Sequence, residues 1–204
     1  MNMWQCAVCD HVSVTDEPPD TCPVCNSPKD KLHPYQPPSG GPKTWENLKS
    51  AFAGESQATL RNRAFARKSE EEGLPQISHL FRAVAAAEEV HAYNHLNHLG
   101  LIKDTQANLN AAFERENLAQ LGAYPEFIRN AEEEGSEELA LSFSRNRDVE
   151  KEHGKLYEKA LSHMLAGSNT TYYVCQVCGY VADNLLPEEC PICGAPQTSF
   201  KLVD

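Results

Sequence analysis

The 204-residue sequence predicts a mainly α-helical protein, in which a four-helix bundle is flanked by two small cysteine-rich modules. All eight cysteines belong to Cys-x-x-Cys pairs near the two ends, and the 149 positions between Cys25 and Cys175 contain none. The middle of the chain is rich in Ala, Leu, Glu and Arg, and its only prolines are Pro75 and Pro125. A net charge of −11 and the absence of a long apolar run predict no nucleic-acid or membrane partner.

The cysteine pairs predict one metal site in each terminal module, residues 1–35 and 169–204. Because the start of the chain lacks a signal-peptide core, we expect a reducing, cytoplasmic location, where thiolate metal sites are commoner than disulfides. Two closely spaced pairs supply the four ligands of a tetrahedral Fe or Zn site. Each module is too small to bury a sufficient core without its metal. The ligands are Cys6, Cys9, Cys22 and Cys25 at one end, and Cys175, Cys178, Cys190 and Cys193 at the other.

A linker rich in proline and glycine, residues 36–43, precedes the predicted bundle, residues 44–168. Thr44 is expected to cap the first helix, and Gly167 is expected to end the last. The third helix is expected to break at Tyr124-Pro125, with further helical turns through Glu134. The four expected helices span about residues 44–72, 75–99, 105–123 and 136–166.

Carboxylates lie on the apolar stripes of these helices, in a pattern that occurs twice. Glu55 is followed 33 positions later by the pair Glu88-x-x-His91. Glu116 is followed 34 positions later by Glu150-x-x-His153. Glutamates on solvated faces would be the ordinary explanation of one such pair, but inner-face charges are costly unless they bind something. One Glu from each of two helices and a Glu-x-x-His from each of the others is the ligand set of a di-iron carboxylate bundle, in which four carboxylates balance two ferrous ions.

Several motifs together make the sequence resemble the rubrerythrin family over about 160 residues. They are Ala51-Phe52-Ala53-Gly54-Glu55-Ser56-Gln57-Ala58, both Glu-x-x-His pairs, Tyr124-Pro125 and the C-terminal cysteine motif. The resemblance implies a ferritin-like di-iron bundle with a rubredoxin-like Fe(Cys)4 domain, which reduces peroxide in oxidative-stress defence. It also implies that Tyr124 hydrogen-bonds a di-iron carboxylate. The implied iron ligands are Glu55, Glu88, His91, Glu116, Glu150 and His153.

The sequence departs from the usual pattern of this family in three ways. Ala119 stands where a further helix-C glutamate is usual, so the remaining six-ligand set resembles the more symmetric centre of bacterioferritin. Asn62 replaces a helix-A tyrosine. The N-terminal rubredoxin-like module is an addition, and in it Asp10 and Asn26 replace the glycines that favour positive φ.

The short connection between the second and third helices predicts a helix-swapped homodimer. In a ferritin-like site these helices run in the same direction, so the chain must return roughly 30 Å along the bundle. Residues 101–104 span at most about 17 Å. We therefore expect the first two helices to pack against the last two of another chain.

The predicted function is a non-haem di-iron peroxidase that reduces hydrogen peroxide to water. One rubredoxin-like site would accept electrons from an external reductase, and the other would feed the di-iron centre. Two alternatives remain: a dioxygen-reducing or ferroxidase bundle, or a non-enzymatic interaction protein with zinc at both cysteine sites.

Overall fold

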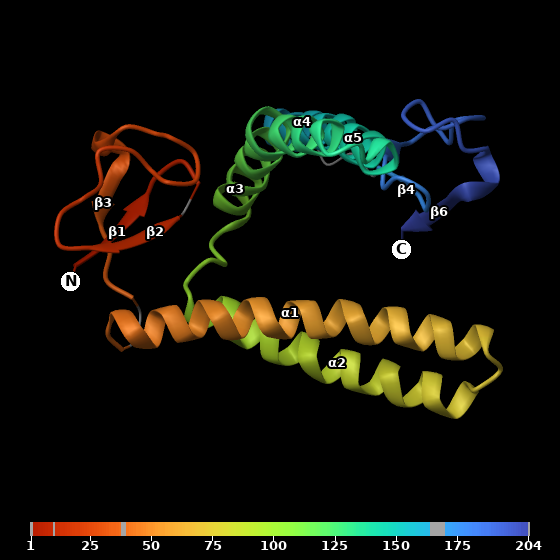
Figure 1. The fold of residues 1–204 in the computed structure, drawn as a ribbon, viewed down its shortest axis with the longest axis horizontal. Coiled ribbons are helices and arrows are strands. Elements are labelled where there is room, and N and C mark those ends of the chain that lie inside the picture. Colours follow the sequence, from red (N-terminus) through yellow and green to blue (C-terminus); the bar gives the residue numbers. More distant parts are fainter. Residues whose placement is uncertain (1, 10, 38–39, 164–169, 204) are drawn as a thin grey trace. The chain divides into compact units, whose positions relative to one another are not determined.

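The computed structural model describes residues 2–9, 11–37, 40–163 and 170–203, and it confirms the predicted mainly helical fold (Figure 1). The chain forms two units. The first contains an N-terminal sheet and a long helical hairpin, and the second contains both cysteine sites, three further helices and a C-terminal sheet. No helix within the described ranges is long and apolar enough to span a bilayer.

The N-terminal sheet has three strands in the order β2-β1-β3. Strand β1 (Asn2–Cys6) pairs antiparallel with β2 (Val12–Thr15), and Trp4 lies opposite Ser13. A 3-10 turn, Lys29–Lys31, leads into β3 (Leu32–Pro34). The sheet presents Met3 and Val12 to a buried cluster that also contains Trp45 and Leu99 of the helical hairpin. The Tyr35 hydroxyl donates a hydrogen bond to the Leu99 carbonyl (3.0 Å), which holds the sheet on the hairpin.

Helices α1 (Pro42–Glu71) and α2 (Pro75–His98) form this hairpin, with Gly73 at φ 72° in the turn. The predicted start at Thr44 is wrong, because α1 begins two residues earlier, with Pro42 in its first turn and Gly41 as its extended N-cap. The fixed φ of proline suits the first helical position, and the Trp45 N–H closes the turn on the Gly41 carbonyl. The ring centroids of Phe65 on α1 and Phe81 on α2 lie 5.5 Å apart, so the two rings are in contact across the hairpin.

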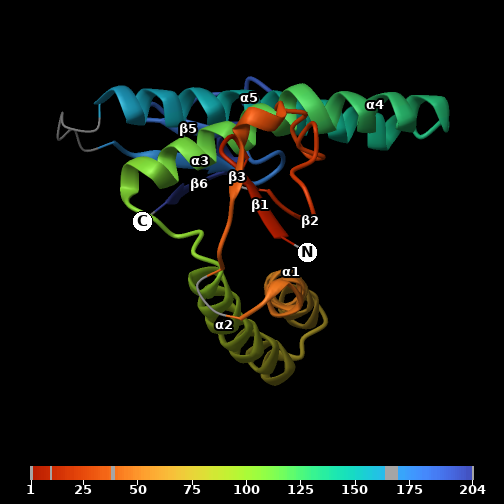
Figure 2. The ribbon, with the colours of Figure 1, turned by 90° about the vertical axis from the view of Figure 1, so that its left-hand side faces the viewer.

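The second unit contains α3 (Thr105–Leu118), α4 (Tyr124–Glu133) and α5 (Glu137–His163). The expected break at Tyr124-Pro125 is absent, because a π-helical turn, Ala119–Ala123, joins α3 to α4. The Tyr124 N–H donates to the Ala119 carbonyl five residues earlier, and this wider turn accommodates the proline ring. Figure 2 shows α4 lying along α5. The predicted helix end at residue 166 and its stop signal Gly167 lie outside the described residues.

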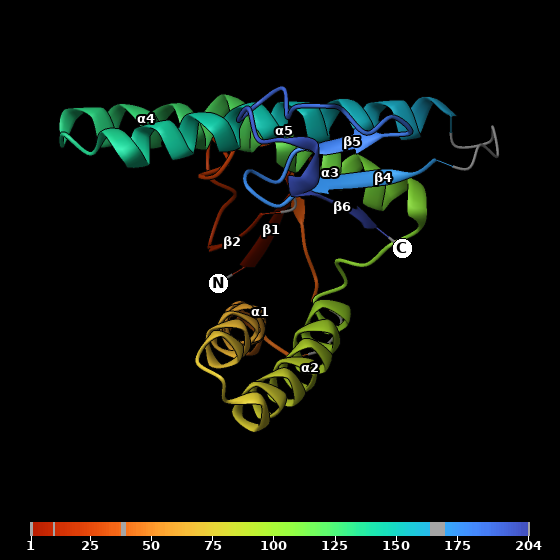
Figure 3. The ribbon, with the colours of Figure 1, turned by 90° about the vertical axis from the view of Figure 1, so that its right-hand side faces the viewer.

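The C-terminal sheet repeats the topology of the N-terminal one, in the order β5-β4-β6. Strand β4 (Tyr172–Cys175) pairs antiparallel with β5 (Val181–Asp183) and with β6 (Phe200–Val203). This sheet lies alongside α5 (Figure 3), and an ion pair joins Lys159 of α5 to Asp183 of β5.

Candidate metal centres

The first group of predicted iron ligands lies on the α1–α2 hairpin. Glu55 comes from α1, and Glu88 and His91 come from α2. Each residue offers one donor atom, and the three donor atoms lie within 4.8 Å of one another. Because the helix places residues three apart on the same face, His91 Nδ1 lies 2.9 Å from Glu88 Oε2. The His91 side chain is 54% exposed, so this group is open to a further ligand or chain.

The second group has the same composition and lies between α3 and α5. Glu116, Glu150 and His153 converge with their donor atoms within 4.8 Å of one another. His153 Nδ1 lies 3.1 Å from Glu150 Oε2 and 3.8 Å from Glu116 Oε1. Burial, together with the hydrogen bond and negative charge of Glu150, raises the pKa of Glu116 to about 7. Two half-buried carboxylates this close repel each other when both are ionised, unless a cation compensates their charge. This arrangement is typical of a cation site.

His153 has both ring nitrogens engaged. Its Nε2 lies 3.1 Å from the carbonyl oxygen of Gly179, which accepts only if Nε2 carries the proton. The other nitrogen, Nδ1, then presents its lone pair to the space between Glu116 and Glu150. A carbonyl bond to the distal nitrogen is the usual way in which proteins orient a metal-binding histidine.

Two tyrosines lie beside the second group. Burial and the negative charge of Glu150 raise the pKa of Tyr124, whose hydroxyl interacts with Asn146 and Glu150. Burial and the charges of Glu116 and Glu150 likewise raise the pKa of Tyr157. The sequence pattern places Tyr157 on the stripe one turn after His153, but spacing alone does not separate it from an ordinary core residue.

Two other positions noted in the sequence do not reach the carboxylates. Asn62 donates to the Ala58 carbonyl of its own helix. Ala119 begins the π-helical turn after Glu116 and contributes no donor side chain. The second group therefore has one histidine and two carboxylates, which matches the first group residue for residue.

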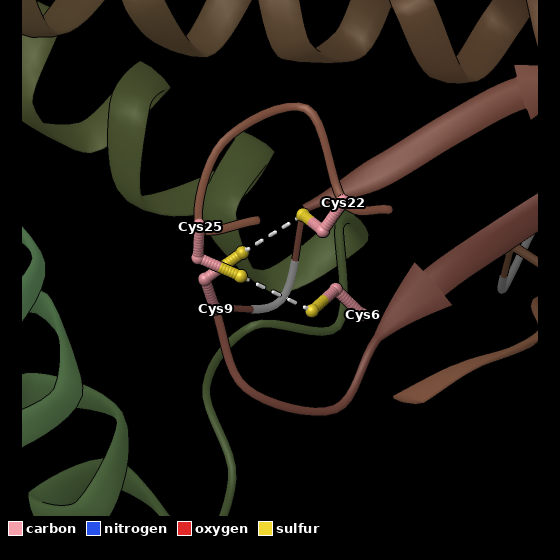
Figure 4. A group of neighbouring side chains, drawn as sticks. All are labelled: Cys6, Cys9, Cys22 and Cys25. Atoms are coloured by element: carbon pink, nitrogen blue, oxygen red, sulfur yellow. Dashed lines mark hydrogen bonds between the residues drawn. The ribbon is translucent and has the colours of Figure 1, made fainter. Parts of the chain in front are cut away.

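The four cysteines of the N-terminal site point their sulfurs toward one another (Figure 4). The Cys6–Cys25 and Cys9–Cys22 sulfur pairs lie 3.6 and 3.5 Å apart. A disulfide requires about 2.05 Å. A tetrahedral ion with metal–sulfur bonds of about 2.3 Å places its sulfurs about 3.8 Å apart, so the site fits a single ion. Asn26 has φ 56°, as predicted for the residue that replaces glycine after Cys25; Asp10 lies outside the described residues.

The C-terminal site has the same geometry. The sulfurs of Cys175 and Cys193 lie 3.8 Å apart, and those of Cys178 and Cys190 lie 3.6 Å apart. Gly179 follows Cys178 with φ 84°, and its carbonyl is the one that meets His153. A hydrogen bond between His153 and Gly179 therefore links this C-terminal cysteine site to the second carboxylate group.

The pKa values of the cysteine thiols differ, and burial and hydrogen bonds explain the differences. Burial raises the pKa of Cys9 and of Cys178. Burial acts in the same direction on Cys25, but hydrogen bonds from the Ser27 hydroxyl and backbone N–H outweigh it and lower its pKa to about 7. The Ser27 hydroxyl lies 2.9 Å from the Cys25 sulfur, a contact that the cysteine spacing does not predict.

Comparison with known proteins agrees with this geometry. The rubrerythrin family model matches residues 46–161, and the rubrerythrin rubredoxin-like domain model matches residues 4–33 and 173–201. A rubrerythrin of Porphyromonas gingivalis is 37% identical over 180 residues, which cover 79% of this chain and 90% of that protein. Nigerythrin of Nitratidesulfovibrio vulgaris is 33% identical over 178 residues, 77% of this chain and 85% of that protein. The chain therefore belongs to the rubrerythrin family, an oxidoreductase family of di-iron proteins, and carries rubredoxin-like domains at both ends.

Proposed function

We propose that this protein reduces hydrogen peroxide to water, with two electrons and two protons consumed for each peroxide. The observation that carries the proposal is the pair of matched Glu, Glu, His groups, one of which is hydrogen-bonded to a cysteine metal site. Together the two groups hold four carboxylates and two imidazoles, the donor set of a di-iron carboxylate centre. The cysteine sites also agree with a reducing, cytoplasmic location.

The Glu and His side chains of the two groups would hold a pair of ferrous ions, which would supply the two electrons and Lewis-acid stabilisation of the departing hydroxide. The chain's own residues hold this pair and keep its charge balanced, since four carboxylates neutralise two divalent cations. Tyr124 positions Glu150 through its hydroxyl, and Gly179 orients His153 through its carbonyl. In this proposal Glu55, Glu88, His91, Glu116, Glu150, His153 and Tyr124 are the catalytic residues.

In this proposal Cys175, Cys178, Cys190 and Cys193 would hold the iron ion that returns electrons to the di-iron centre. The path from the Cys178 sulfur to the His153 ring is short. It runs along the backbone from Cys178 to Gly179 and then across the hydrogen bond between the Gly179 carbonyl and His153. Cys6, Cys9, Cys22 and Cys25 would hold the iron ion that accepts electrons from an external reductase. Stopped-flow re-reduction of the oxidised protein in Cys6→Ser and Cys175→Ser variants tests this division. We expect Cys175→Ser to slow the final transfer to the di-iron centre more strongly, and equal rates would contradict the route.

A second copy of the chain completes each centre in this proposal. At the C-terminal end of α2, the N–H groups of Leu99 and Gly100 donate to carbonyls of the last helical turn. At the start of α3, the Asp104 side chain accepts a hydrogen bond from the Ala107 N–H (2.9 Å). Both helix ends are therefore well defined, and the four residues between Gly100 and Thr105 cannot span the return of roughly 30 Å that a bundle within one chain requires. The α1–α2 hairpin also exposes large apolar side chains: Leu60, Phe65, Leu80 and Val90.

A second function, reduction of dioxygen or oxidation of ferrous iron, is favoured by Ala119. Alanine offers no carboxylate, so the α3–α5 group gains no additional ligand at this position. Both groups then have two glutamates and one histidine, as in a symmetric centre. Anaerobic stopped-flow mixing of the diferrous protein with peroxide or with dioxygen separates the two functions. We expect faster oxidation by peroxide; faster oxidation by dioxygen would favour the second function.

A further inference from the structure

The two cysteine sites are built alike around their last cysteine. The Cys22 N–H donates to the Ser27 carbonyl, and the Cys190 N–H donates to the Ala195 carbonyl, both at 2.8 Å. An isolated bridge joins Thr21 to Pro28 in the first site, and an equivalent bridge joins Glu189 to Pro196 in the second. Ser27 and Ala195 therefore occupy the same place in the two sites.

The backbone donors to the sulfurs also match. The Ser27 N–H bonds to Cys25, as the Ala195 N–H bonds to Cys193. The Ser27 side chain adds a contact that alanine cannot make, with its hydroxyl 2.9 Å from the Cys25 sulfur. Cys25 and Ser27 are both half-buried, so bulk water competes weakly for this contact.

A metal-bound thiolate carries no proton, so in the loaded site the Ser27 hydroxyl is the donor and the Cys25 sulfur accepts. A ferric ion with four thiolates has one net negative charge, and a ferrous ion has two. The added electron increases the negative charge on the sulfurs, which strengthens a hydrogen bond donated to them. Such a bond stabilises the reduced state more than the oxidised state and raises the reduction potential.

We propose that the Ser27 hydroxyl gives the N-terminal cysteine site a higher reduction potential than the C-terminal site. The N-terminal site is therefore reduced first and stores an electron. This inference rests on iron occupying both cysteine sites, and it does not depend on which oxidant the di-iron centre uses. Each site takes up one electron from a one-electron donor, and no bond forms or breaks. Transfer of the stored electron to the C-terminal site is then unfavourable by about tenfold in its equilibrium constant. It proceeds as the C-terminal site is reoxidised through Gly179 and His153.

The test is a spectroelectrochemical titration of the full, iron-loaded chain, in which the absorbance of the ferric thiolate sites is the readout. Iron content is measured for every variant. We expect two one-electron steps in the unmodified protein. Ser27→Ala should lower the reduction potential of the upper step by ~59 mV. For a one-electron couple this is a change of about tenfold in the equilibrium constant for reduction. Ala195→Ser should raise the lower step in the same way, because its hydroxyl would face Cys193 as Ser27 faces Cys25.

Two further variants serve as controls. Ser27→Thr retains a hydroxyl and should keep the upper step close to its original potential. Ser13→Ala removes a buried hydroxyl of the same module that has no hydrogen-bond partner in the structure, and it should move neither step. Full iron content with an unmoved upper step in Ser27→Ala would overturn the inference. So would a single step shared by both sites in the unmodified protein. A protein that oxidises faster with dioxygen than with peroxide would contradict the proposed function but leave these titrations unchanged.

Discussion

His153 Nε2 lies 3.1 Å from the carbonyl oxygen of Gly179, the residue that follows Cys178. This hydrogen bond joins α5 to the loop that holds the C-terminal cysteine site. It has two consequences for the same side chain, because it fixes the tautomer of His153 and brings the cysteine site next to the carboxylates. Any change that loosens the C-terminal domain from α5 is therefore expected to affect electron delivery without removing a ligand.

The ion pair between Lys159 and Asp183 offers a way to loosen that domain. We expect Lys159→Ala to slow re-reduction of the di-iron centre a few-fold while iron content is unchanged, because the pair holds β5 on α5. Lys155→Ala is the matched control, since Lys155 pairs with Glu152 of its own helix. Stopped-flow absorbance at low and high salt measures the effect, and high salt should slow the unmodified protein toward the rate of the variant. Equal rates for the Lys159 and Lys155 variants would contradict this role.

The raised pKa of Glu116 predicts a pH-dependent stability of the metal-free protein. Its pKa of about 7 exceeds the unfolded value of 4.5, so the folded state binds more protons between these values. Stability should therefore fall as pH rises from about 4.5 through about 7. Glu116→Gln removes the charge, and we expect it to raise the melting temperature of the metal-free protein at pH 8 by a few degrees, with a smaller change at pH 5.

Iron should reverse the effect of that substitution. Once cations balance the carboxylates, Glu116→Gln removes a ligand and should lower the melting temperature. Circular dichroism melts with and without iron measure both changes, and Glu133→Gln, at an exposed site of α4, is the control. The same shift at both pH values in the metal-free protein would show that the charge of Glu116 is not responsible.

Mixing two inactive variants tests whether each centre combines two chains. Glu88→Ala damages the α1–α2 group, and Glu150→Ala damages the α3–α5 group. In a swapped dimer that contains one chain of each kind, one centre is intact and the other carries both changes. Random pairing of equal amounts should restore about a quarter of the centres. Co-expression with two different affinity tags, followed by iron analysis and a peroxide assay, measures the recovery. Centres built within one chain would show no recovery at all.

The Tyr35 hydroxyl is expected to hold the N-terminal sheet on the helical hairpin. Tyr35→Phe removes its hydrogen bond to Leu99 and should cost about 1 kcal/mol. For a chain of this size the melting temperature should fall by about 2–4 °C. Tyr93→Phe, at an exposed position on α2, is the control. Calorimetry of the iron-loaded protein measures both variants, and a fall of the same size for Tyr93→Phe would argue against a specific role of this bond.

The helical bundle, the two cysteine modules and both Glu-x-x-His pairs can be recognised in the amino-acid sequence. These features are local: a helix places residues three apart on one face, and a Cys-x-x-Cys turn places two sulfurs together whatever surrounds them. The helix ends were less predictable. Pro42 extends α1 to an earlier start, and a π-helical turn carries the chain past Pro125, because local hydrogen bonding there outweighs the usual signals.

The contacts between distant parts of the chain, in contrast, depend on how the elements pack. The contact of His153 with Gly179 joins positions 26 residues apart, and no spacing rule connects a helix with a cysteine loop. The contact of Ser27 with Cys25 is short in sequence, but it depends on the side-chain direction that the closed loop imposes. Sequence patterns therefore identify the ligand types, whereas packing decides which nitrogen of a histidine faces the carboxylates and which sulfur receives an additional hydrogen bond.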